Sequence, residues 1–202
     1  MRHPDSLPPI TAQAKARKTH STVVVDGGAV GEFDALALYR EMDAKRLHRG
    51  LSWQEVAQEI WDQSAVLNRR RQDHPISPST LTGIAKRGDC TCQHALFILR
   101  WLGLPPEDFM STPPQIGHST NLPEVGPEQR LRWDLAELHS ALNAQRLRQD
   151  LTWAELARKL RCTSSQLTGI RTARFAIGMK LAMRITQWLK RPANSFIYAA
   201  KW

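Results

Sequence analysis

The chain contains two copies of one sequence block, and this repeat constrains the fold more than any other feature. Residues 42–57 (MDAKRLHRGLSWQEVA) align without a gap on residues 142–157 (LNAQRLRQDLTWAELA). Two further blocks follow in the same order: SPSTLTGI (77–84) matches TSSQLTGI (163–170), and RWLGLPPEDF (100–109) matches QWLKRPANSF (187–196). Because the order of the blocks is kept, we interpret the chain as a duplicated domain.

The spacing of these blocks predicts the domain organisation. The offset between copies falls from 100 to 86 residues, so the first copy carries about 14 extra residues, within an insertion at about 61–76. We expect a first domain at 33–110, a linker with four prolines at 111–130 and a second domain at 131–202. Residues 1–32 show no sustained periodicity and are expected to form a disordered tail. The alternative is an arm that contacts phosphates through Lys15, Arg17 and Lys18.

The hydrophobic pattern predicts an all-α fold. Trp153, Leu156, Ala157 and Leu160 follow the i, i+3, i+4, i+7 spacing of one helix face. This helix is preceded by a capping box, Thr152-x-x-Glu155, and Ser52-x-x-Glu55 is its counterpart in the first copy. Thr163 and Ser77 are expected to cap the next helix of each copy, and no alternation typical of a strand has a useful length.

The stretch WAELARKLRCTSSQLTGIRT (153–172) has the pattern of a helix-turn-helix motif. Ala157 supplies the small residue where the two helices touch, and the outward face of the later helix is short and polar. The arrangement resembles the Cro and lambda-repressor-like (XRE) family over roughly 33–110 and 131–198. This resemblance implies two tandem five-helix domains, each of which presents its third helix to base edges in a major groove.

Two departures from the family pattern lie in the turns. Where the family often has glycine, the second copy has Arg161-Cys162, so its turn is expected to be strained or differently shaped. The first copy has the insertion there, and its second helix is expected to run on to Arg70, with the Arg69–Arg71 cluster near a helix C-terminus. A turn of that length favours a smaller part in base reading for the first copy.

The resemblance and the geometry of the motif assign candidate DNA contacts. In the second copy, Gln166 is expected to bind adenine, Thr152 a phosphate, and the residues after the third helix phosphate or guanine. The complete set there is Thr152, Ser164, Ser165, Gln166, Thr168, Arg171 and Arg174. The matching set in the first copy is Ser79, Thr80, Thr82, Lys86 and Arg87. The alternative is that these side chains are ordinary solvated surface.

Charge separates the two copies. The chain has 28 Lys and Arg against 19 Asp and Glu, a net charge of +9. Residues 34–110 hold ten of each kind, whereas residues 131–202 hold thirteen basic and four acidic residues, or +9. Because phosphate contacts dominate DNA affinity, the second copy is expected to contribute most of it.

These features predict a sequence-specific bacterial transcriptional regulator that binds double-stranded DNA. The alternatives are a protein-interaction module similar to an antitoxin or anti-activator, and an architectural DNA binder in recombination or plasmid maintenance. A homodimer or another protein partner through the first domain stays open, and so does the reading of one asymmetric site by both copies of a single chain. Arg46 and Arg146 are expected either to pair with Glu55 and Glu155 or to contact phosphates.

Several other classes are disfavoured. Cys90-x-Cys92-x-His94 is too tightly spaced for a structural zinc site, so no metal or other cofactor is expected. Three cysteines and no apolar segment of membrane-spanning length indicate a cytoplasmic, nucleoid-associated protein without membrane contact. No phosphate-binding loop, nucleophile elbow or catalytic spacing is present, so no enzyme is expected. No small-molecule site is evident from the sequence.

Overall fold

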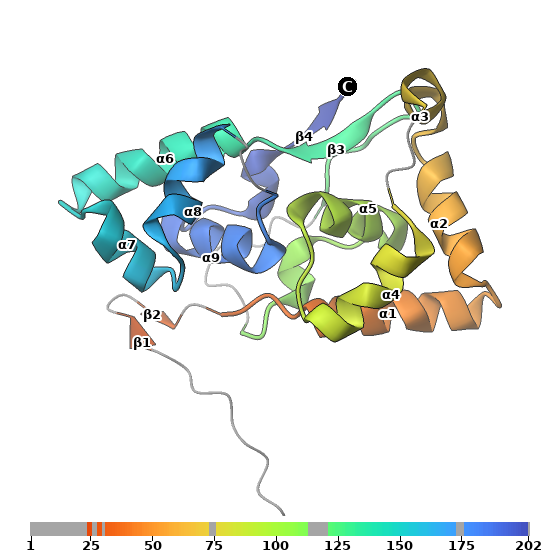
Figure 1. Cartoon of the computed structure of the whole chain (residues 1–202), viewed down its shortest axis with the longest axis horizontal. Helices are drawn as coiled ribbons and strands as arrows, with labels where there is room; N and C mark the ends of the chain where they lie inside the picture. Colours follow the sequence, from red (N-terminus) through yellow and green to blue (C-terminus); the bar gives the residue numbers. More distant parts are fainter. Residues whose placement is uncertain are drawn as a thin grey trace, which may run out of the picture.

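The computed structural model describes residues 24–25, 28–29, 31–72, 76–112, 121–172 and 176–201. Nine α-helices lie in these ranges, together with two small two-stranded sheets (Figure 1). The mostly helical class is therefore confirmed. Among the described residues, no helix is long and apolar enough to cross a bilayer.

The two repeats share the order of four α-helices and a final 3₁₀ helix, but not every other element. The first comprises β1 (Val24–Val25), β2 (Gly28–Ala29), α1 (Ala35–His48), α2 (Trp53–Asp62), α3 (Ala65–Arg71), α4 (Pro78–Arg87), α5 (Cys92–Leu102) and η1 (Pro106–Phe109). The second comprises β3 (Arg130–Trp133), α6 (Leu135–Arg148), α7 (Trp153–Lys159), α8 (Ser164–Gly169), η2 (Ile170–Thr172), α9 (Met179–Leu189), η3 (Ala193–Phe196) and β4 (Ile197–Ala200). Helix α3, which lies in the insertion, has no counterpart among the described residues of the second repeat.

The helix starts follow the predicted capping residues. Complete capping boxes form at Ser52 and Thr152, each with the glutamate three residues later. Ser77 caps α4 and Thr163 caps α8 in the same way, since each hydroxyl oxygen accepts the backbone N–H of the residue three positions later. These local predictions are confirmed.

The turns that end equivalent helices share a left-handed backbone even where their residues differ. Gly50, after α1, has φ of 65°, and Asp150, after α6, has φ of 50°. Gly103, after α5, has φ of 77°, and Lys190, after α9, has φ of 53°. The backbone therefore repeats although the first copy uses glycine where the second uses residues that pay a steric cost.

The second helix of the first repeat ends at Asp62, so the prediction that it runs on to Arg70 is wrong. The helical backbone is interrupted at Ser64, and α3 begins after it as a separate helix. Arg100 donates to the carbonyl of Gln63 at 2.7 Å and to the hydroxyl of Ser64 at 2.8 Å. These bonds satisfy backbone and side-chain groups outside the helix ladder, which compensates for the interruption. The three arginines do occupy the last turn, but of α3.

A short sheet that the sequence did not predict closes the second repeat. Strand β3 pairs antiparallel with β4, with Trp133 opposite Ile197. In the first repeat an isolated bridge between Phe33 and Met110 takes the equivalent place. Each pairing joins the chain before the first helix to the chain after the last 3₁₀ helix. Strands of four residues are too short to produce a recognisable alternation in the sequence.

The repeats meet through a pair of reciprocal backbone hydrogen bonds. Cys92 N–H donates to Ile177 C=O at 2.9 Å, and Met179 N–H donates to Cys90 C=O at 2.8 Å, around a bridge between Thr91 and Gly178. Because α5 and α9 align at an offset of 87 residues, 90 corresponds to 177, 91 to 178 and 92 to 179. Equivalent residues thus contact each other, which is the signature of a two-fold relation, here within a single chain.

The core continues across this junction. Buried apolar side chains of both repeats belong to one contiguous cluster, which includes Leu38 and Leu99 from the first and Leu138 and Ile185 from the second. Strand β3 lies along α5, and α5 contacts α9. The described residues therefore form one body rather than two modules hanging on a linker.

A shared core predicts that both repeats unfold together. Leu99→Ala, at a fully buried position of α5, should lower the free energy of unfolding by about 2–5 kcal/mol because it leaves a cavity. The control, Leu47→Ala, removes a side chain that is 62% exposed and should change it by less than about 0.5 kcal/mol. Urea denaturation followed by circular dichroism measures both. Two separate transitions, of which only one responds to Leu99→Ala, would contradict a common core.

Candidate nucleic-acid interface

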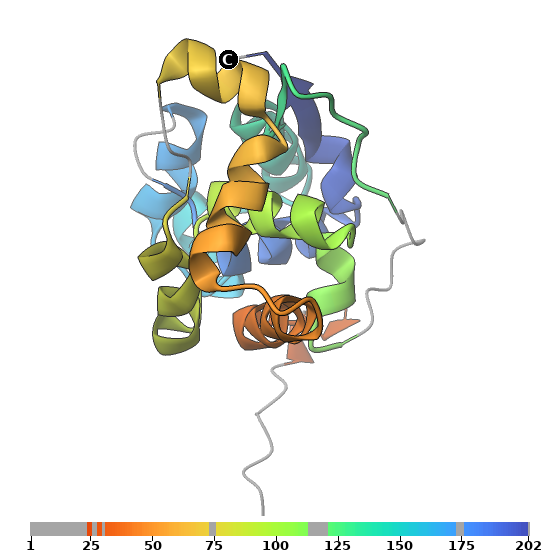
Figure 2. The same cartoon turned by 90° about the vertical axis from the view of Figure 1, so that its right-hand side faces the viewer.

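Helices α4 and α8, which carry the predicted reading residues, lie on the same face of the molecule. Both are in the foreground of Figure 1, and both lie along the left side of Figure 2, in which the viewer looks from the right of the first view. The bridge between Thr91 and Gly178 joins the segments that follow the two motifs. A single partner surface can therefore contact both helices at the same time.

The front of α8 is a network of exposed polar side chains. Thr163 Oγ1 accepts the backbone N–H of Gln166, whose side-chain oxygen in turn accepts the N–H of Thr163 at 2.8 Å. Ser165 Oγ lies 3.0 Å from Thr163 Oγ1, and Thr168 Oγ1 donates to the carbonyl of Ser164. Gln166 thus completes a capping box that the sequence analysis did not identify. A bidentate contact with adenine would require its amide to leave this cap.

The first repeat builds a matching network at the start of α4. Ser77 Oγ accepts the N–H of Thr80 and lies 2.9 Å from the hydroxyls of both Ser79 and Thr80. Thr82 Oγ1 donates to the carbonyl of Pro78 at 3.2 Å. The candidate residues of the two repeats therefore share a hydrogen-bond pattern as well as their positions in the sequence. The first repeat differs in having Thr80 where the second has Gln166, so it presents no amide there.

The candidate cations lie in the last turn of α4 and in η2, directly after α8. Lys86, Arg87 and Arg171 are exposed. Arg87 Nη2 donates to the carbonyl of Thr80 at 3.2 Å, so its side chain lies back along α4, against Gly83. Arg171 projects from η2, directly after α8. Arg174 lies outside the described residues.

Thr152 is less available for phosphate than the sequence suggested. Its hydroxyl and its backbone N–H both donate to Glu155 Oε2, at 2.7 and 2.8 Å. A carboxylate therefore already occupies the start of α7, and the pKa of Glu155 is lowered by its hydrogen bonds with Thr152. A phosphate at this helix end would compete with that negative charge.

A groove of about 800 Å³ runs beside α8, and sequence reasoning did not identify it. Its walls include His139, Arg146 and Trp153, together with Ser165 and Thr168. The His139 ring stacks on Trp153 at 5.4 Å between centroids, and the Arg146 guanidinium lies 4.7 Å from the Trp153 centroid. Desolvation and the nearby Arg171 lower the pKa of His139. The sequence feature that could have indicated this groove is the repeat of Arg46 and Trp53 as Arg146 and Trp153.

Arg46 and Arg146 do not pair with Glu55 and Glu155, so that expectation is wrong. Arg46 contacts Asp43 at 2.7 Å, and Arg146 donates to Asn143 at 2.8 Å. Both glutamates are engaged in capping boxes instead. The arginines also donate to the carbonyls of Leu51 and Leu151, which fixes the loop before α2 and α7.

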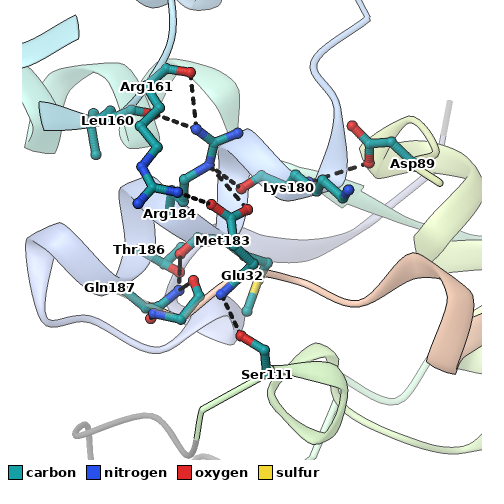
Figure 3. Close-up of polar contacts among 11 residues, drawn as sticks. Glu32, Asp89, Ser111, Leu160, Arg161, Lys180, Met183, Arg184, Thr186 and Gln187 are labelled. Atoms are coloured by element: carbon teal, nitrogen blue, oxygen red, sulfur yellow. Dashed lines mark hydrogen bonds and ion pairs between the residues drawn. The ribbon is translucent and has the colours of Figure 1, made fainter. Parts of the chain in front are cut away.

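The turn between α7 and α8 is held by the chain that precedes α1 (Figure 3). Arg161 has the left-handed backbone of this turn, with φ of 51°, in place of glycine. Arg184 donates to the carbonyls of Leu160 and Arg161, at 2.5 and 3.0 Å. Glu32 forms ion pairs with Arg161 at 3.3 Å and with Arg184 at 3.6 Å. The first repeat thus contributes to the geometry of the second motif.

Neighbouring contacts fix that crossing segment. Gly31 N–H donates to the side-chain oxygen of Gln187, whose amide nitrogen donates back to the carbonyl of Gly31, at 2.9 and 3.0 Å. Glu32 N–H donates to Ser111 Oγ at 2.8 Å. Residues 31–32, which the sequence analysis assigned to the tail, therefore join the repeats.

The cysteines show no sign of reactivity. Burial raises the pKa of the Cys90 thiol to about 12 and that of Cys92 well above its ordinary value. Among the described residues, no group of His, Cys, Asp and Glu is arranged to hold a metal ion. These thiols are thus packed as small apolar groups.

No protein-family model, curated protein or solved structure matches this chain.

The left-handed turn at Arg161 makes a pair of substitutions informative. Arg161→Gly and Arg161→Ala both remove the ion pair with Glu32, but only glycine relieves the steric cost of the positive φ. The glycine variant should be more stable than the alanine variant by about 1 kcal/mol in urea denaturation. Equal stability of the two variants would show that this turn is not left-handed in solution.

Proposed function

We propose that this protein is a sequence-specific DNA-binding transcriptional regulator built from two tandem helix-turn-helix units of the lambda-repressor-like type. The observation that carries the proposal is the two-fold relation at Thr91 and Gly178, which brings α4 and α8 to one face. Homodimeric helix-turn-helix proteins present two reading helices to successive major grooves through the same symmetry. In this proposal a single chain uses the same type of arrangement.

The polar networks at the front of α4 and α8 support base contact. Hydroxyl groups serve as donors or acceptors toward either bases or phosphates, and Gln166 adds an amide in the second repeat. Exposed cations lie at the C-terminal ends of both motifs, with Lys86 and Arg87 in the last turn of α4 and Arg171 in η2 after α8. Short polar side chains in front and cations behind suit a helix that enters a groove between two phosphate backbones.

The two units differ, and the difference favours unequal roles. The second repeat carries the net charge of +9, whereas the first is neutral. The first repeat carries the insertion helix α3 at the turn of its motif, where the second has only Arg161 and Cys162. The second unit therefore supplies most of the affinity, and the first adds a weaker contact on the adjacent groove.

Unequal units in a fixed arrangement predict an asymmetric operator. Selection of bound DNA from a random pool should yield two different half-sites about one helical turn apart, bound by one chain. Native mass spectrometry of the complex gives the number of chains. A perfect palindrome bound by two chains would overturn the proposal that both motifs of one chain read DNA. Absence of binding at low salt would instead support a protein-interaction module.

Substitution of Gln166 tests base reading. Gln166→Ala should weaken specific binding by about 1–3 kcal/mol and relax one base position in the second half-site. Arg171→Gln should weaken specific and non-specific binding alike and lower the salt slope by about one, as loss of a phosphate contact does. The control is Gln149→Ala, at an exposed position after α6. Because Gln166 also caps α8, thermal unfolding of each variant is measured in parallel. An unchanged selected sequence for Gln166→Ala would exclude Gln166 as a reader.

A further inference from the structure

A second hollow, of about 530 Å³, lies where the two repeats meet. Its walls come from the start of α5, from β3 and the start of α6, from η2, from residues 176–177 and from β4. They include Gln93, Arg132, Trp133, Arg171, Ile177 and Tyr198. Cavities of this size accommodate small organic ligands. Because its residues are scattered from 91 to 198, no sequence motif could indicate it.

The charge around this hollow favours an anion. Two guanidinium groups line it, and Arg132 is held in place by a 3.0 Å bond from its Nη1 to the side-chain oxygen of Gln93. Gln93 is itself fixed, because its amide donates to the carbonyl of Leu131 at 3.0 Å. The carboxylate in the wall, Asp134, is engaged as the cap of α6, where it accepts the N–H of Glu137. A ligand carboxylate would thus meet two cations and one carboxylate already in use.

The indole N–H of Trp133 supplies a second, independent indication. This residue is only 8% exposed, and its Nε1 finds no acceptor among the described residues. Buried indole N–H groups usually have a partner, and an unpaired buried donor costs free energy. An acceptor atom on a ligand in the adjoining hollow would remove that cost. The apolar walls, such as Ile177 and the ring of Tyr198, suit a flat hydrocarbon body.

From this combination we infer that the hollow between the repeats is a binding site for a small aromatic carboxylate. The carboxylate pairs with Arg132 and Arg171 and accepts the indole N–H of Trp133, and the ring lies against Ile177 and Tyr198. This assignment departs from the sequence analysis, which found no small-molecule site.

The position of the site links it to the arrangement of the two motifs. Thr91 and Ile177, which belong to the reciprocal junction between the repeats, are both in its wall. Arg171, also in the wall, follows α8 directly. A bound ligand therefore contacts both repeats and a proposed phosphate-binding residue. The resulting change in DNA affinity rests on the proposed function, whereas ligand binding itself does not.

The test is an NMR titration of the full chain with benzoate, benzamide and benzylamine, without DNA. The indole N–H signal of Trp133, assigned by its loss in Trp133→Phe, reports on the site. Benzoate should shift this signal saturably with a dissociation constant on the order of 1 mM, as its size allows. Benzamide should bind roughly tenfold more weakly, because it lacks the charge, and benzylamine should not bind.

Variants separate this site from non-specific anion binding. Arg132→Gln and Arg171→Gln should each weaken benzoate binding roughly tenfold, whereas Arg40→Gln, which removes the same charge from an exposed position of α1, should leave it unchanged. Arg171 is exposed, so its variant stays informative even if Arg132→Gln does not fold. No shift of the Trp133 signal with benzoate, or equal shifts with all three compounds, would overturn the assignment. A DNA-binding assay with benzoate then tests the coupling separately.

Discussion

The arrangement of this protein depends on one reciprocal contact, in which Cys92 and Met179 each donate a backbone hydrogen bond across the junction to Ile177 and Cys90. Backbone bonds leave no freedom to shift one repeat by a residue without breaking both. The bridge joins the residues that directly precede α5 and α9. These are the most completely buried helices of their repeats. The junction therefore fixes the position of one core relative to the other, and with it the relative positions of α4 and α8.

Crossing segments reinforce this junction on both sides. The chain before α1 reaches the second repeat, where Glu32 meets Arg161 and Arg184. The chain before α6 reaches the first repeat, where β3 lies along α5 and Arg130 in β3 contacts Asn68 of α3. The insertion helix thus has a structural use, since it provides the surface on which the described part of the predicted linker and β3 pack. The two crossing segments use different side chains. The backbones of the two repeats are therefore related by an approximate two-fold axis, whereas the side-chain contacts around the junction are not.

Local features could be predicted from the sequence because their causes are local. The repeat offset identified equivalent helices, and the capping residues at 52, 77, 152 and 163 marked helix starts. The positive φ at Arg161 corresponds to the strained form of the turn, which was one of the two outcomes expected where the family has glycine. In contrast, no residue near Thr91 or Gly178 signals a bridge between them, because a contact 87 residues apart in the chain has no periodicity to reveal it. The break at Ser64 depends on Arg100, which lies 36 residues further along the chain and so outside any local pattern. The capping role of Gln166 is local, because Thr163-x-x-Gln166 has the capping-box pattern, and it was missed because Gln166 was assigned to base reading.

The claim on which the rest depends is that the two motifs form one rigid body. Native-state hydrogen exchange tests it at the amides of Cys92 and Met179, which make the reciprocal bonds. If the repeats separate only when the whole chain unfolds, both amides should exchange with the same free energy as the slowest amides of α5 and α9. If either amide exchanges with a markedly lower free energy while the helices of both repeats stay protected, the junction opens in the folded protein, and the fixed placement of α4 and α8 is contradicted.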